Sequence, residues 1–109
     1  MPAYVIVNAD VIDEEAAWAY APVAQRSILS HGGRYLAAGP TPAPVEGTWD
    51  SARFVAIEFP DMARVREWYD SPEYRRAREI RGDKVRVSML FVEGAPPEGF
   101  SLPTTAPPH

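Results

Sequence analysis

Apolar and polar side chains alternate in four stretches of the chain, and this pattern predicts four β-strands. A strand turns successive side chains to opposite faces of its sheet, so alternation is typical of a strand with one buried face. β-branched and aromatic residues, which favour strands, are frequent in the same stretches. The predicted strands span residues 3–11, 35–38, 53–59 and 85–92.

Residues 14–30 carry apolar side chains at helical spacing instead and predict a helix. Asp13 is placed to cap its N-terminus. Gly32 and Gly33 are placed to end it, because glycine readily adopts the left-handed backbone found at helix C-termini. Pro22 lies inside this stretch. We expect it to kink or break the helix, since proline lacks the backbone donor that a helix interior requires.

A second helical region follows Pro60, which ends the preceding strand, and Asp61 is expected to cap this region. Ser71 and Pro72 then interrupt it. A serine cap followed by proline in the first helical position is typical of a new helix, which we expect to run to about Ile80.

The resulting order βαββαβ predicts an α+β domain with the ferredoxin-like arrangement, in which an antiparallel four-stranded sheet carries two helices on one face. The chain has 109 residues, the usual size of one domain and too few for two good cores. We therefore assign residues 1–94 to one domain. Residues 39–50 are expected to form a loop rich in proline and glycine, and residues 95–109 a Pro-rich C-terminal tail.

The two faces of the predicted sheet differ in polarity. The face expected to pack against the helices consists of Val5, Val7, Ala9, Val11, Tyr35, Ala37, Val55, Ile57, Phe59, Val85, Val87, Met89 and Phe91. The second face consists of Tyr4, Ile6, Asn8, Asp10, Arg34, Leu36, Ala38, Phe54, Ala56, Glu58, Arg86, Ser88, Leu90 and Val92. So large an apolar patch is unusual on a monomer, and we therefore expect a homodimer that packs through this second face.

Five polar residues of the second face can gather in or near a partly enclosed space, namely Asn8, Arg34, Glu58, Arg86 and Ser88. Two interpretations remain open. In the first, these groups form an ordinary ion-pair network of the interface, since buried charges are usually paired for structural reasons. In the second, they supply the few convergent polar contacts of a mainly apolar ligand pocket.

Three motifs occur in chain order, namely His31-Gly32-Gly33-Arg34-Tyr35-Leu36, Ile57-Glu58-Phe59-Pro60 and Trp68-Tyr69-Asp70-Ser71-Pro72-Glu73-Tyr74. Together they resemble the family catalogued as domain of unknown function 1330, over residues 3–94, and the last motif is the most specific. The resemblance implies a dimeric α+β barrel, in which two ferredoxin-like sheets pack face to face. Relatives in that superfamily include cofactor-free oxygenases, haem-dependent enzymes and small-molecule isomerases, whereas the family itself has no agreed activity.

The candidate catalytic residues are His31 and Glu58. His31 is predicted at a helix C-terminus, where a charged imidazole is favourable and where a general base could also lie. Glu58 is either a proton acceptor or the partner of Arg34 or Arg86. An arginine neighbour would make its carboxylate a weaker base.

The candidate ligand-binding residues are Asn8, Arg34, Tyr35 and Arg86. Among them, Arg34 is expected to clamp the anionic group of a carboxylate or enolate. Trp68, Tyr69 and Tyr74 could also line a ligand site, although aromatic residues at helical spacing normally pack in a core.

The chain contains no cysteine, which excludes disulfides, thiolate chemistry and cysteine-bound metal sites. The two histidines, His31 and His109, lie far apart in the chain, so we expect no metal site. No phosphate loop, dinucleotide fingerprint or paired-histidine motif occurs, so we expect no cofactor. Haem would need His31, the single histidine of the predicted domain, as its axial ligand.

Composition also bears on partners and location. The net charge of −4 and the absence of an aromatic stacking pair on residues 53–59 argue against nucleic-acid binding. No apolar run approaches the about 20 residues of a membrane span, so we expect no membrane insertion. The N-terminus shows no signal-peptide pattern, and we expect a cytoplasmic location.

Two hypotheses of function follow. The first is a small-molecule-binding protein or cofactor-independent enzyme of the dimeric α+β barrel type, with oxygenation or isomerase-like proton transfer as its chemistry. The second is a non-catalytic structural or interaction dimer without a ligand. The sequence leaves open which molecule is bound and whether any reaction is catalysed.

Overall fold

The computed structural model describes residues 1–39, 41–49, 52–94 and 99. Its elements are β1 (Ala3–Val11), α1 (Glu14–Ser30), β2 (Arg34–Ala38), β3 (Arg53–Phe59), α2 (Met62–Tyr69), α3 (Pro72–Arg81) and β4 (Val85–Glu93). Every predicted strand and helix is present, with ends that move by at most one residue. The predicted proline-rich tail, residues 95–109, lies outside the described residues except for Gly99.

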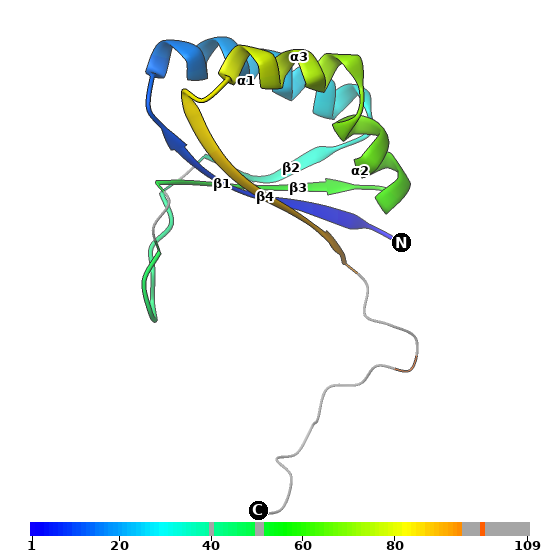
Figure 1. The fold of residues 1–109 in the computed structure, drawn as a ribbon. Coiled ribbons are helices and arrows are strands. Elements are labelled where there is room, and N and C mark those ends of the chain that lie inside the picture. The colour runs from blue at the N-terminus through cyan, green and yellow to red at the C-terminus, as the bar shows by residue number, and fades with distance from the viewer. Residues whose placement is uncertain (40, 50–51, 95–98, 100–109) are drawn as a thin grey trace, which may run out of the picture.

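The four strands form one antiparallel sheet in the order β2-β3-β1-β4, which confirms the predicted α+β ferredoxin-like class. β1 occupies the middle and pairs with β3 on one side and β4 on the other. The helices all lie on one face of this sheet, with α1 and α3 side by side above it and α2 at one end (Figure 1). The other face carries no helix.

α1 begins where the side chain of Asp13 accepts hydrogen bonds from the backbone N–H groups of Glu15 and Ala16, as predicted. The helix then runs through Pro22 to Ser30, so Pro22 does not break it, and the kink stays a prediction. Proline removes one hydrogen bond to the carbonyl of the residue four positions earlier, here Trp18. Pro22 and Trp18 are both exposed, and water can solvate that carbonyl while the opposite face of the helix stays packed.

The Gly32–Gly33 pair ends α1 for two different reasons. Gly32 has a φ of 85°, in the left-handed region that favours glycine. Gly33 is a point of close approach, because a Cβ there would lie 2.7 Å from Cγ2 of Ile28 and 2.8 Å from Cζ of Phe59. The turn from α1 into β2 therefore has no room for a side chain at Gly33.

α2 and α3 begin at the predicted caps. The Asp61 side chain accepts from the N–H of Arg64, and the Ser71 hydroxyl accepts from the N–H of Tyr74. Pro72 occupies the first turn of α3, where its missing N–H costs no helical hydrogen bond.

The core lies between the helices and the apolar face of the sheet, and Trp68 is at its centre. The Trp68 ring is fully buried, with its centroid 4.2 Å from that of Tyr74 and 5.4 Å from that of Phe59. Its indole N–H donates to the hydroxyl of Ser27 on α1 at 3.0 Å. This bond joins α2 to α1 inside the core and satisfies the one polar atom of the ring.

A β-bulge in β2 changes which side chains face the helices. The pairing of β2 with β3 shifts between Tyr35 and Ala37, so that Ala37 lies opposite Ala56 and Ala38 lies opposite Val55. Ala38 therefore points to the helix side and Ala37 to the open side, the reverse of the alternation predicted from sequence. A bulge inserts one extra residue and inverts the faces beyond it, which simple alternation cannot reveal.

Replacing Ser27 with alanine should destabilise the protein by about 1–3 kcal/mol, because the buried indole N–H of Trp68 loses its acceptor. Ser30, one turn later and exposed, provides the matched control, and Ser30→Ala should change the free energy of unfolding by less than about 0.5 kcal/mol. Urea denaturation of both variants measures the difference. Equal effects would show that the Ser27–Trp68 bond does not matter to stability.

Candidate functional site

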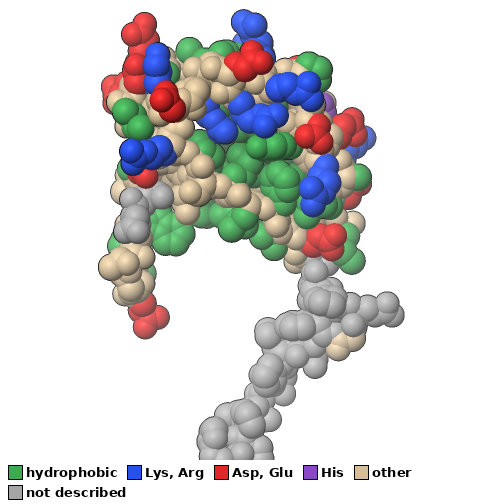
Figure 2. Space-filling view, viewed as in Figure 1, with side chains coloured by type: hydrophobic (Ala, Val, Ile, Leu, Met, Phe, Trp, Pro, Cys, Tyr) green, Lys and Arg blue, Asp and Glu red, His purple; other side chains and the backbone are tan. Residues whose placement is uncertain are grey.

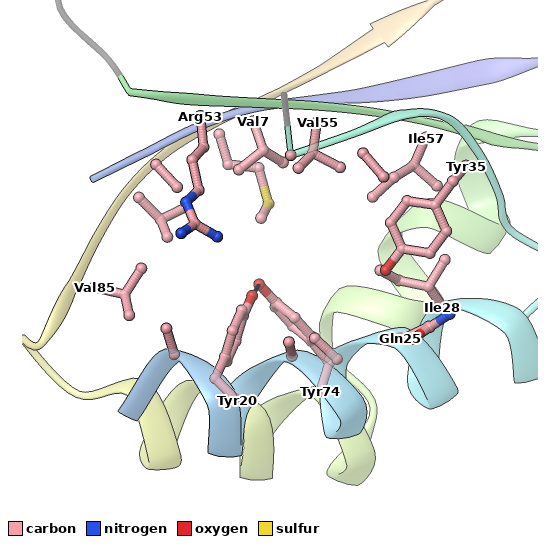
Figure 3. Close-up of a pocket in the computed structure, with 18 of the residues that line it drawn as sticks. Val7, Tyr20, Gln25, Ile28, Tyr35, Arg53, Val55, Ile57, Tyr74 and Val85 are labelled. Carbon is pink, nitrogen blue, oxygen red and sulfur yellow. Dashed lines mark hydrogen bonds between the residues drawn. The ribbon is translucent and has the colours of Figure 1, made fainter. Parts of the chain in front are cut away.

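A cavity of about 480 Å³ lies between the helical layer and the sheet (Figure 3). The apolar side chains of the sheet form its roof, and α1 with its alanines forms most of its floor. Its lining consists of Val7, Ala9, Val11, Ala17, Tyr20, Ala21, Ala24, Gln25, Ile28, Tyr35, Ala38, Gly39, Arg53, Val55, Ile57, Trp68, Tyr74, Val85, Val87 and Met89. Volume and apolar lining are both typical of small-molecule sites, which range over about 300–1,000 Å³.

Two tyrosine hydroxyls meet in this cavity. Tyr20 of α1 and Tyr74 of α3 point toward the sheet, and their hydroxyl oxygens lie 2.8 Å apart in a hydrogen bond (Figure 3). Arg81 lies behind them, with its Nη1 3.5 Å from the Tyr20 oxygen and 3.4 Å from the Tyr74 oxygen. The floor of an otherwise apolar space thus holds a small hydrogen-bonding centre with a cation beside it.

Burial keeps two of the phenols of the cavity neutral. Burial raises the pKa of Tyr35 to about 12. Burial, followed by the neighbouring Tyr20, raises the pKa of Tyr74 well above its ordinary value. The cause is the same in both cases, because a charged phenolate is poorly solvated in an apolar site. At neutral pH, Tyr35 and Tyr74 are therefore hydrogen-bond donors and not bases.

Arg53 and Gln25 complete the polar lining. Arg53 is the first residue of β3, and its side chain points from the sheet into the cavity (Figure 3). Gln25 extends from α1 beside Ile28. No aspartate, glutamate or histidine is among the described residues that line the cavity, so its charge is positive.

The open face of the sheet carries an ion pair. Nε of Arg34 donates to Oε1 of Glu58 at 2.7 Å, across the register of β2 and β3. Hydrogen bonding from Arg34 lowers the pKa of Glu58, and the Glu58 carboxylate, as acceptor of a hydrogen bond from the phenol, raises the pKa of Tyr4. The pair makes Glu58 a weaker base, as the partner interpretation requires. The catalytic role of Glu58 and the clamp role of Arg34 stay predictions.

The two other candidates on this face, Asn8 and Arg86, lie farther along the strands than the Arg34–Glu58 pair. Asn8 lies between Phe54 and Ser88 in the register of β1, and its Oδ1 is buried without a hydrogen-bond partner in the described part of the chain. Arg86 is exposed on β4, opposite Asp10 of β1. The Arg34–Glu58 pair is the one ion pair found within residues 1–39, 41–49, 52–94 and 99.

His31 lies at the C-terminal cap of α1, where sequence placed it. Its Nδ1 is 2.7 Å from the carbonyl oxygen of Ser27, which fixes the ring against the last turn of the helix. This contact matches the structural interpretation, in which the imidazole interacts with the carbonyl end of the helix. His31 does not line the cavity, and its role as a base stays a prediction.

Of the residues predicted to be catalytic or to bind a ligand, Tyr35 belongs to the described lining of the cavity. Trp68 and Tyr74, two of the aromatic residues considered as ligand contacts, also line it while packing in the core. Asn8, Arg34, Glu58 and Arg86 are on the other face of the sheet, so the structure does not bring the predicted constellation together around this space. The chain lacks a cluster of three or more histidine and carboxylate side chains for a metal within its described part, and no helix there is long and apolar enough to cross a membrane.

The family model described as Domain of unknown function (DUF1330) matches residues 2–95, which is most of the chain. This chain belongs to that family. The resemblance predicted from the three sequence motifs is therefore confirmed. Among curated proteins, none matches the chain significantly.

Solved structures share the fold of this DUF1330 member. One is a protein of unknown function from Rhodopseudomonas palustris, with a TM-score of 0.66, 19% identity, and coverage of 87% of this chain and 84% of the other. Another is a dimeric ferredoxin-like protein of unknown function from Bacteroides fragilis, with a TM-score of 0.55 and 16% identity over 85% and 96% of the two chains. A third, from Nitrosomonas europaea, is described as a proposed antibiotic biosynthesis monooxygenase, with a TM-score of 0.52 and 12% identity over 86% and 98%. Identities this low show the fold alone.

Sequence reasoning missed Tyr20, Gln25 and Arg53 as site residues of this DUF1330 domain. Signals for two of them were present. Tyr20 places a hydroxyl on the apolar stripe of residues 14–30, and Arg53 continues the inward alternation of Val55 and Ile57. A polar atom at an inward position indicates a site, because buried polar groups need partners.

The raised pKa of Tyr35 should be visible in alkaline unfolding. A tyrosine with an ordinary pKa of 10.0 in the unfolded chain and about 12 in the folded protein stabilises the fold fully below pH 10, and this stabilisation is lost as the pH rises to about 12. Tyr35→Phe should therefore reduce the loss of stability across that interval, as measured by urea denaturation at stepped pH.

The phenolate absorbance of the folded and urea-unfolded chains provides the control for this experiment. In urea, the tyrosines should ionise near their ordinary pKa, whereas the folded wild type should show a late-titrating fraction that is smaller in Tyr35→Phe. An unchanged late fraction would contradict the burial of this phenol.

Proposed function

We propose that this protein binds a small, mainly apolar organic molecule in the cavity between its helices and its sheet. The observation that carries this proposal is the presence of several polar groups that converge on a cavity of about 480 Å³ with otherwise apolar walls. Protein interiors are normally packed as densely as organic crystals, whereas this space stays unfilled and opens to solvent beside Ala21 and Arg53, where a ligand can enter. A retained cavity of this size with convergent polar groups is the usual form of a ligand site.

The walls of the cavity support binding more directly than catalysis. Neutral phenols at Tyr35 and Tyr74 can donate hydrogen bonds to an oxygen of the ligand, and such donors stabilise enolate or phenolate character where it develops. A general base is not supplied by the described lining, which has no carboxylate and no imidazole. If the protein is also an enzyme, we expect cofactor-independent oxygenation or proton transfer. His31 and Glu58 are the predicted bases for such a reaction, and both lie outside the cavity.

The open face of the sheet supports a homodimer as part of the same proposal. Leu36, Leu90 and Val92 on this face are 50%, 53% and 43% exposed. Residues 41–49 project beyond the sheet on the same side, away from the helices, and bring Trp49 within 6.3 Å of the Phe54 ring (Figure 1). A second copy of the chain would cover these apolar groups.

The charge distribution fits this arrangement. In the view of Figure 2, charged side chains of both signs lie mostly over the helices, and hydrophobic side chains are exposed below them. α3 alone contributes Arg75, Arg76, Arg78 and Arg81. Charge therefore keeps the helical layer in water and leaves the sheet face as the surface available for association.

A larger side chain at a cavity-lining position should fill the cavity and abolish ligand binding. Ala21 and Ala19 are both exposed alanines of α1, but Ala21 lines the cavity and Ala19 does not. A thermal-shift screen of small carboxylates, phenols, quinones, flavin and haem should find compounds that raise the melting temperature of the wild type, because selective binding to the native state stabilises it. Ala21→Phe should remove the shift and Ala19→Phe should keep it.

The same screen can contradict the proposal. If no compound stabilises the protein, or if Ala21→Phe responds as the wild type does, the cavity is not a binding site for these classes. The non-catalytic dimer without a ligand would then be the better account of the fold.

Dimerisation should be broken by charge on the open face. Leu90 and Leu29 are each 53% exposed, the first on the sheet face and the second on α1, so they form a matched pair. Leu90→Arg should lower the native mass from twice the chain mass to the 12.1 kDa of one chain, whereas Leu29→Arg should leave it unchanged. Light scattering coupled to size exclusion measures both. A wild-type protein that is monomeric at micromolar concentration would contradict the dimer.

A further inference from the structure

The cavity holds two polar centres that face each other. The guanidinium group of Arg53 descends from the sheet, and the hydroxyls of Tyr20 and Tyr74 rise from the helices toward it (Figure 3). Most of the remaining walls are apolar side chains of valine, isoleucine and alanine. A ligand that occupies the cavity therefore meets hydrogen-bond donors from two layers of the fold in the same region.

The charge of this region is positive. Arg53 is the one charged side chain in the described lining, and no described carboxylate forms an ion pair with it. Arg81 stands behind the tyrosine pair and donates to both phenolic oxygens. Arginine favours carboxylates because its planar guanidinium can give two parallel hydrogen bonds to the two oxygens.

The tyrosine pair can also donate a hydrogen bond to a ligand. Burial raises the pKa of Tyr74, so its hydroxyl keeps its proton. One hydroxyl of the pair donates to the other across 2.8 Å, and Arg81 can only donate to these oxygens. The second phenolic proton therefore remains free for an acceptor in the cavity. An anionic oxygen is the acceptor that best matches a phenol backed by an arginine.

We propose that the ligand is a small organic monocarboxylate whose carboxylate lies between Arg53 and the Tyr20–Tyr74 pair. This inference rests on the proposed function and names the ligand class of that site. Arg53 is the one cation of the described lining and matches one negative charge, because Arg81 lies outside the lining and contacts the phenolic oxygens. A phosphate dianion would bring a second charge for which the described lining holds no cation. The apolar body of the acid extends toward Ile57 and Tyr35, where the walls are apolar and the Tyr35 hydroxyl is a further donor.

Arg53 is exposed at the edge of the sheet, so its charge is solvated when the cavity is empty. Binding replaces that water by the ligand's carboxylate and covers the apolar walls with the ligand's body. Both parts are needed, because an exposed ion pair alone contributes little affinity. The site should therefore prefer acids with a ring or a branched chain over formate or acetate, which have little apolar surface to bury.

The test uses matched pairs of probes, namely benzoate with benzamide and 2-naphthoate with 2-naphthamide. Each pair keeps the ring and the planar head group and differs in charge. Calorimetry or ligand-observed NMR on the full chain should show tighter binding of each carboxylate than of its amide. Arg53→Gln should weaken carboxylate binding by about tenfold or more, which is the usual effect of losing a charge-assisted hydrogen bond. Amide binding should hardly change.

Two further variants make this result specific. Arg53→Lys keeps the positive charge but loses the two parallel hydrogen bonds of the guanidinium, and it should retain more carboxylate affinity than Arg53→Gln. Arg76→Gln removes an exposed arginine of α3 from outside the cavity and should leave both probes unaffected. Circular dichroism of each variant checks that the fold is intact.

The outcomes separate the two proposals. Equal affinities for carboxylate and amide, both insensitive to Arg53→Gln but lost in Ala21→Phe, would overturn the monocarboxylate inference and leave the binding cavity standing. Failure of every probe to bind, or binding that Ala21→Phe does not affect, would overturn both. Tighter carboxylate binding that depends on Arg53 supports both.

Discussion

The burial of Trp68 is the interaction on which the rest of this structure depends. Its ring packs against Phe59 of β3 and Tyr74 of α3, and its N–H is held by Ser27 of α1. One side chain thus connects the sheet with three helices and sets their distance from it. Where the large aromatic rings end, α1 presents alanines to the valines of the sheet, and these short side chains leave the gap that becomes the cavity. The site is a consequence of how the core is packed.

The two faces of the sheet satisfy their polar groups in different ways. On the open face, the charged groups of Arg34 and Glu58 satisfy each other in an ion pair. Inside the cavity, Tyr20 and Tyr74 satisfy only one of their two protons with each other, and Arg53 has no described carboxylate partner. A polar group that retains unused bonding capacity within an apolar space is the feature that separates a binding site from a structural network.

Local sequence signals were sufficient for most of the fold. Asp13, Asp61 and Ser71 identify helix starts, because a cap depends only on the residues next to it. The bulge in β2 was not predictable by alternation, since nothing in Tyr35–Ala38 shows that β3 pairs with it out of register. Pro22 does not break α1 for a related reason, because the packing of the whole helix outweighs a defect on its exposed side.

The candidate site was harder to predict than the fold. The sequence showed which residues share a face, but it did not show that a space would remain on the helix side. That space depends on the size of side chains from several elements at once, such as Ala21, Ala24 and Val87. Polar residues of the open face, including Asn8 and Arg86, attracted the functional interpretation because they stand out in the alternating pattern, whereas Arg53 is hidden at the edge of a strand.

The strand order has a consequence for how the protein is made. Among the four strands of this sheet, β1 is made first and lies inside the sheet, yet one of its neighbours, β4, is made after the other three. Until the chain has been synthesised through Glu93, β1 has one edge without a partner, and α1 and α3 have three of the four strands to pack against. Such long-range pairing slows folding and exposes a strand edge to other chains. The nascent chain is therefore most vulnerable to misassociation shortly before its last strand is complete.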